Sequence, residues 1–118
     1  MATYSRAELR NQVLEDLALM DESSAPHADD ATLCDRRCQQ ELERLAEDGL
    51  IPFDLDADAI PAPYMGPLAA VIAPTLVGAY GLYQRRAELE ALAAEGMRKL
   101  YKLRHADDFG SINRATYF

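Results

Sequence analysis

The chain has 118 residues, enough for one small domain, and its 49% hydrophobic and 27% charged residues are ordinary for a globular protein. The net charge of −8 divides unevenly: residues 1–60 carry 15 acids and 5 bases, net −10, and residues 61–118 carry 5 acids and 7 bases, net +2. An acidic half disfavours tight binding to a nucleic-acid backbone, and the low aromatic content of 8% favours helices over a sheet.

A first helix is expected to begin at Ser5. Ser5 and Glu8 have the spacing of a capping box, in which each side chain accepts a hydrogen bond from the other residue's backbone N–H. Apolar residues then recur every three or four positions, at Leu9, Val13, Leu17 and Met20. Because the chain enters this charged helical pattern without an apolar segment, we expect no secretory signal.

A second, long helix is predicted from about Pro26, capped by Ser23 or Ser24, to a left-handed glycine at Gly49. Its apolar stripe comprises Ala31, Cys34, Cys38, Leu42 and Leu45. The other faces are densely charged, which is most simply a solvated surface; the alternative is a surface that repels DNA or docks on a basic partner.

The segment Leu50 to Ile60 is predicted to be extended, because apolar and acidic residues alternate from Phe53 to Asp56. Little else resembles a strand, so this segment is expected to pair with a neighbouring subunit or with the C-terminal tail. The candidate subunit-interface residues are Leu50, Ile51, Phe53, Leu55 and Ile60.

A third helix, Pro63 to Tyr80, is apolar nearly all round and should form the core, with a kink at Pro74. The prolines and glycines within residues 61–84 make this stretch a poor membrane span, and no membrane partner is expected. A fourth helix is predicted over Tyr83 to Arg104, with acids early and bases late, in the order that complements the helix dipole.

The residues after Arg104 show no helical period, yet they include aromatics that a disordered tail would usually lack. The predicted fold is therefore all-α: a small four-helix bundle with a short extended segment after the second helix and an extended C-terminal tail. Residues 1–104 form the helical domain, and residues 105–118 form a docking tail with candidate contacts at His105, Phe109, Ile112, Arg114, Tyr117 and Phe118.

Two groups of residues raise the question of metal binding. His27, Cys34 and Cys38 can share a helix face, but the spacing is not a familiar zinc pattern, and buried core thiols in a reducing compartment are the simpler interpretation. The aspartates 54, 56 and 58 alternate as in a calcium loop, but Ala59 and Met65 occupy the positions of its glycine and glutamate. A solvated strand edge or capping loop is the alternative. No catalytic motif occurs, so we expect neither an enzyme nor a cofactor.

The order of these parts resembles the head–tail connector adaptors of tailed phages, which include tail accessory factors that stabilise packaged DNA. The resemblance rests on Asp48-Gly49-Leu50, an acidic segment ending in Ala59-Ile60-Pro61, the apolar helix Leu68 to Tyr80 and the basic helix Leu89 to Arg104. It covers roughly residues 25–104.

The resemblance implies a virion neck protein, made in the host cytoplasm, that assembles as a twelve-fold ring under the portal. Such a ring extends the DNA channel and gives tail, nozzle or stopper proteins a platform, and its C-terminal segment docks on the portal. Double-stranded DNA passes through without specific binding, for which an acidic wall is suited. The candidate channel-facing acids are Asp29, Asp30, Asp35 and Glu41. The alternative is a small acidic helical binding module that captures a basic protein through the second helix.

Overall fold

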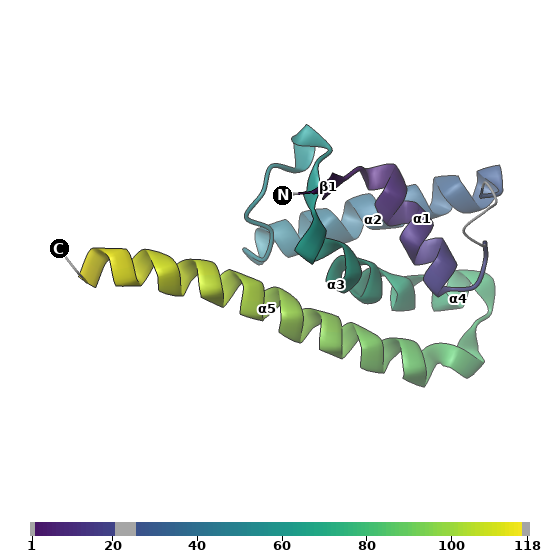
Figure 1. Cartoon of the computed structure of the whole chain (residues 1–118). Helices are drawn as coiled ribbons and strands as arrows, with labels where there is room; N and C mark the ends of the chain where they lie inside the picture. Colours follow the sequence, from purple (N-terminus) through teal and green to yellow (C-terminus); the bar gives the residue numbers. More distant parts are fainter. Residues whose placement is uncertain (1, 21–25, 117–118) are drawn as a thin grey trace.

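Helices make up most of the chain in the computed structural model, which describes residues 2–20 and 26–116, with side chains in the last helix described as far as residue 105. The helices are α1 (Arg6–Asp16), α2 (Ala28–Glu47), α3 (Ala62–Ile72), α4 (Val77–Tyr80) and α5 (Arg86–Thr116). The other described elements are three 3₁₀ turns, η1 (Leu55–Ala57), η2 (Ala73–Leu76) and η3 (Tyr83–Arg85), and two short strands, β1 (Thr3–Tyr4) and β2 (Ile60–Pro61). The predicted all-α class is confirmed (Figure 1).

The N-terminal capping box of α1 forms as predicted. The Glu8 backbone N–H donates to the Ser5 hydroxyl at 3.2 Å, and the Ser5 N–H donates to the Glu8 carboxylate at 3.3 Å. The helix ends earlier than the apolar stripe indicated, at Asp16, because Ala18 takes a left-handed conformation with φ of 60°. Leu17 still reaches the core from the turn that follows the helix.

The start of α2 differs from the prediction. His27 is the N-cap, and its Nδ1 accepts a hydrogen bond from the Asp29 N–H at 3.4 Å, so Pro26 lies just before the helix. The expected caps Ser23 and Ser24 lie outside the described residues. The predicted end is confirmed: Gly49 follows the helix with φ of 77°, a conformation that glycine adopts without steric cost.

The segment after α2 is not a strand awaiting another chain, and this expectation was wrong. Ile60 and Pro61 pair antiparallel with Tyr4 and Thr3 near the N-terminus of the same chain. The period-two pattern before them forms the 3₁₀ turn η1, because the Asp54 carboxylate caps the backbone N–H of Asp56 at 2.9 Å. Local side-chain capping thus prevailed over the alternation of apolar residues.

The predicted third helix is interrupted where Pro74 occurs. A regular helix, α3, ends at Ile72, the 3₁₀ turn η2 contains Pro74, and helical geometry resumes in α4. The stretch Ala62–Tyr80 is long and apolar enough to cross a membrane by composition, with a mean hydropathy of 1.3, but half of it is buried within the fold. Residues of α3 and η2 contribute Leu68, Ile72 and Leu76 to the centre of the core.

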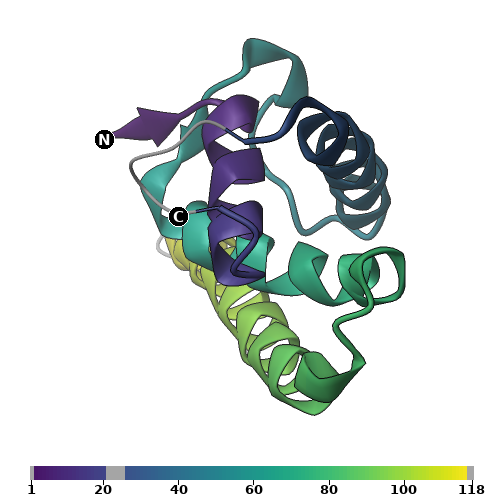
Figure 2. The ribbon, with the colours of Figure 1, turned by 90° about the vertical axis from the view of Figure 1, so that its right-hand side faces the viewer.

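The C-terminal segment corrects the sequence prediction most strongly. Residues 105–116, expected to be an extended tail, continue α5, which is 31 residues long. No proline occurs after Pro74, and each residue added to an existing helix costs little once the helix is nucleated. Figures 1 and 2 show α5 running along one side of the body and extending past it. The radius of gyration, 15.5 Å, exceeds the roughly 13.5 Å of a compact domain of this length.

Candidate interaction surface

The first half of α5 is held in the core by its contacts with α3. Leu89 and Leu100 are buried, and between them Gly96 lies against the α3 backbone. A Cβ at Gly96 would lie 2.8 Å from the carbonyl oxygen of Pro67 and 3.2 Å from the Cβ of Ala70. The two helices therefore approach too closely here for any side chain, and this contact fixes the direction in which α5 leaves the body.

A second contact holds α5 near the point where it passes the end of α2. The Arg104 guanidinium donates hydrogen bonds to the carbonyl oxygens of Gly49, at 2.7 Å, and Asp48, at 3.3 Å. These carbonyls lie at the C-terminal end of α2, where a cation is favoured by the helix dipole. A Cβ at Gly49 would meet the guanidinium end of the Arg104 side chain, which can shift, so glycine is required here for its backbone conformation.

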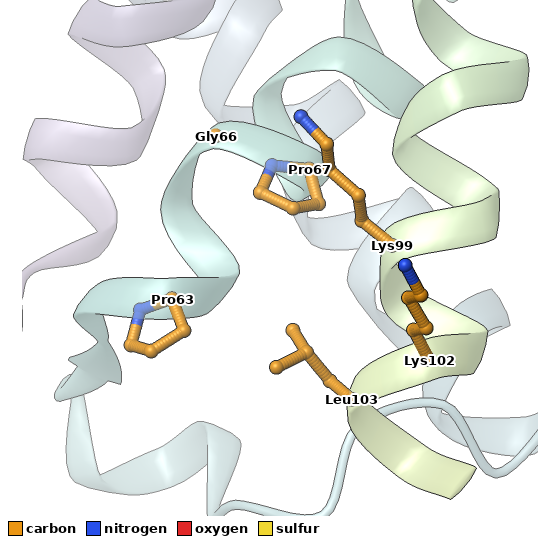
Figure 3. A pocket seen from close by; sticks show the side chains of 6 residues that line it. All are labelled: Pro63, Gly66, Pro67, Lys99, Lys102 and Leu103. Carbon is orange, nitrogen blue, oxygen red and sulfur yellow. The ribbon is translucent and has the colours of Figure 1, made fainter. Parts of the chain in front are cut away.

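Between these two contacts, α3 and α5 enclose a groove of about 580 Å³. Its floor is formed by Pro63, Gly66 and Pro67 of α3 and by Leu103 of α5. The side chains of Lys99 and Lys102 extend along the α5 side of the groove (Figure 3). The groove thus combines an apolar floor with two ammonium groups, and neither lysine forms an ion pair with another described residue.

The same lysines border a second hollow, of about 620 Å³, on the outer side of α5. It is also lined by Tyr101, which is 57% exposed, and by His105. Arg98 pairs with Glu95 one turn earlier. Over residues 98–104, α5 carries four bases and no acid, so this part of the helix is an exposed basic surface with one aromatic side chain.

The predicted docking residues fall on this helix or beyond it. His105 is exposed. Phe109, Ile112 and Arg114 lie within the helical backbone of α5, but their side chains lie outside the described part of the chain. Tyr117 and Phe118 lie outside the described residues altogether. The sequence reasoning overlooked the groove beside Lys99 and Lys102, although the uninterrupted run of bases from Arg98 to Arg104 indicated a charged surface.

The five candidate subunit-interface residues divide into two groups. Leu50 and Ile60 are buried in the chain's own core, at 0% and 2% exposure, so they are not available to another subunit in this fold. Ile51, Phe53 and Leu55 pack against the core while remaining partly exposed. The Phe53 ring makes an edge contact with Tyr64, with ring centroids 5.1 Å apart. For these three residues, subunit contact stays a prediction.

The candidate channel-facing acids are spread along α2 and are partly compensated by bases. Asp29 and Asp35 are exposed, and Asp35 pairs with Arg10 of α1 at 3.1 Å. Glu41 is paired with Arg44 at 2.7 Å. Asp30 is half-buried near Tyr80, whose hydroxyl is buried without a hydrogen-bond partner among the described residues. Burial, with the Asp30 charge nearby, raises the pKa of Tyr80 to about 12.

The two cysteines are buried and free, as the core interpretation predicted. Their sulfur atoms are 4.0 Å apart, and Cys34 Sγ also lies 3.8 Å from the carbonyl oxygen of Arg10. The hydrogen bond to Cys34 and burial both raise the pKa of the Cys38 thiol well above its usual range. Cys38 is therefore a thiol at neutral pH, packed in the core cluster.

The aspartates after α2 form a capping loop, which was one of the alternatives to a calcium site. Asp54 caps η1, and the Asp58 carboxylate accepts a hydrogen bond from the Arg6 N–H at 2.7 Å. Asp58 itself has a left-handed conformation with φ of 51°. Across residues 2–20 and 26–105, His, Cys, Asp and Glu side chains form no group of three or more that could hold a metal ion.

No protein-family model, curated protein or solved structure matches this chain.

Proposed function

We propose that this chain is a structural head-to-tail adaptor of a tailed bacteriophage, assembled as a ring beneath the portal. The ring would extend the DNA channel and give tail, nozzle or stopper proteins a platform, without catalysis or a cofactor. The observation that carries the proposal is α5: one face of its first half packs against α3, and its second half continues past the body as a helix. A rigid projection held by a small core is a form suited to joining two assemblies.

In this proposal the element that docks on the portal is a helix and not an extended peptide. Contacts would then recur every three to four residues, and His105, Phe109 and Ile112 are spaced in that way along α5, whereas Arg114 follows Ile112 by two residues. Helical geometry also lowers the entropic cost of docking, because the backbone is already ordered before binding. The protein would reside in the virion neck after synthesis in the host cytoplasm.

The charge distribution supports the same proposal. The first 60 residues are strongly acidic, and an acidic wall lets double-stranded DNA pass by repelling its phosphates. Asp29 is exposed near the start of α2 and forms no ion pair with another described residue, so its full charge would act on DNA in the channel. Asp35 and Glu41, which pair with arginines, would contribute less to the field at the channel.

The test is binding to the portal protein encoded in the same phage genome. The full-length chain mixed with portal should give a ring below it in negative-stain images, and a chain lacking residues 105–118 should lose that binding. A second variant keeps the full length and changes Phe109 and Ile112 to Ser, so that loss of binding is not confused with loss of the helix.

A matched control is Tyr83→Ser, which removes an aromatic side chain that is 62% exposed on η3, away from the projecting end of α5. This variant should bind portal as the unchanged chain does. Unimpaired portal binding by both α5 variants would overturn the docking role. A small defined complex with a basic protein, and never a ring, would indicate instead the acidic binding module.

A further inference from the structure

We propose that the groove between α3 and α5 receives the acidic η1 loop, residues 54–58, of a second copy of this chain. This contact rests on the proposed function, because it would join neighbouring copies in the ring. It is carried by the complementarity of two surfaces that belong to the same molecule but lie apart on it.

The groove offers two features to a ligand. Pro63, Pro67 and Leu103 provide an apolar floor, and Lys99 and Lys102 place ammonium groups beside it. A ligand that fits must therefore carry small apolar side chains together with carboxylates. Since residues 98–104 contain four bases and no acid, an acidic ligand would meet no like charge on this part of α5.

The η1 loop has the matching features. Between Asp48 and Asp58 the chain carries four acids and no base, and Asp54, Asp56 and Ala57 are exposed. Leu55 is partly buried beneath them. The loop is also held in shape, because Asp54 caps η1 and the Asp58 carboxylate accepts from the Arg6 N–H. A preformed loop loses little conformational freedom on docking.

The loop cannot fill the groove of its own chain. In Figure 1 and in the perpendicular view of Figure 2, the loop lies at the top of the body and α5 at the bottom, with α3 between them. Two different surfaces on one molecule give a head-to-tail contact, and such contacts repeat from copy to copy until a ring closes or a filament grows. A two-fold dimer would instead require both loop–groove pairs to form within a single interface, and two surfaces on opposite sides of the body do not lie in one interface.

The test uses two variants that each damage one surface. The groove variant carries Lys99→Glu and Lys102→Glu. The loop variant carries Asp54→Asn, which preserves the cap on η1, and Asp56→Lys, whose side chain makes no hydrogen bond or ion pair with another described residue. Asp58 is left unchanged because its contact with Arg6 holds the loop in place.

Sedimentation velocity at low ionic strength should show that the unchanged chain self-associates as its concentration rises. Each variant alone should associate at least about tenfold more weakly, because like charges then face each other. An equal mixture of the two variants retains one intact groove and one intact loop. That mixture should form a one-to-one dimer and grow no further.

A control variant, Glu90→Lys, reverses an exposed charge near the start of α5, outside both surfaces and without a hydrogen bond or ion pair to another described residue, and it should associate as the unchanged chain does. The inference is overturned if either double variant associates like the unchanged chain, if the mixture fails to dimerise, or if the unchanged chain stays monomeric at all concentrations. Portal binding by a single copy, measured separately, distinguishes the outcomes: its loss would overturn the adaptor function, and its persistence without loop–groove pairing would overturn only this inference.

Discussion

The two halves of α5 belong to one continuous helix but have opposite relations to the rest of the chain. From Leu89 to Leu100 the helix is part of the core, with Gly96 in contact with the α3 backbone. From Tyr101 onward the described side chains are exposed or only partly buried, as far as residue 105. The comparison shows that one helix can supply the core of a small domain and also present a surface beyond it, because helical hydrogen bonds need no tertiary partner.

The largest expected difference in stability is between substitutions at two adjacent residues of α5, Leu100 and Tyr101. Leu100→Ala should reduce the free energy of unfolding by about 2–5 kcal/mol, because a fully buried leucine leaves a cavity. Tyr101→Ala, one position later and 57% exposed, should change it by less than about 0.5 kcal/mol. Urea denaturation followed by circular dichroism measures both values. Similar losses from the two substitutions would show that Tyr101 does not lie on the exposed face of α5.

The next largest effect is expected where α5 and α3 are closest. Gly96→Ala places a methyl group 2.8 Å from the Pro67 carbonyl oxygen, and we expect a net loss of about 1–2 kcal/mol after the gain in helix propensity. Gly78→Ala is the control in α4, where a Cβ would meet only the Tyr83 hydroxyl, at an ordinary contact distance of 3.9 Å. That substitution should instead stabilise the protein by about 0.5–1 kcal/mol. Thermal unfolding of the two variants should therefore shift in opposite directions.

A smaller effect is expected at Arg104, where the exposed part of α5 still contacts the body. Arg104→Gln shortens the side chain and weakens its hydrogen bonds to the Gly49 and Asp48 carbonyls, and it should cost about 0.5–1.5 kcal/mol. Lys102→Gln, which removes a charge two residues earlier, should cost less than about 0.5 kcal/mol. Hydrogen exchange in Arg104→Gln should also become faster at the end of α2. Unchanged exchange there would contradict the anchoring role.

The smallest effect concerns pH and the exposed face of the helix. The hydrogen bond from Arg98, and the charge of that residue, hold the pKa of the Glu95 carboxyl below its usual range. The folded state therefore favours the carboxylate, so this contribution to stability is present above the ordinary glutamate pKa and is lost as the pH falls through the lowered value. A carboxyl titration followed by NMR should show the lowered pKa, and Arg98→Gln should return it to the ordinary range.

The sequence by itself determined the local features of this protein. The capping box at Ser5, the left-handed Gly49, the interruption at Pro74 and the burial of Cys34 and Cys38 all follow from the chemistry of single residues and from helical periodicity, and each was predicted correctly. The apolar stretch after Pro61 was also recognised as the core, because a helix without a polar face must be covered.

Only the tertiary structure decided how distant segments meet. The strand partner of Ile60 is Tyr4, more than fifty residues earlier, and a two-residue pairing leaves no periodic signal in the sequence. The groove beside Lys99 and Lys102 lies where α5 runs close to α3 at Gly96. The distance between these two helices cannot be predicted from the amino-acid composition. The continuation of α5 to Thr116 also escaped prediction, since its second half lacks the apolar stripe by which a buried helix is recognised.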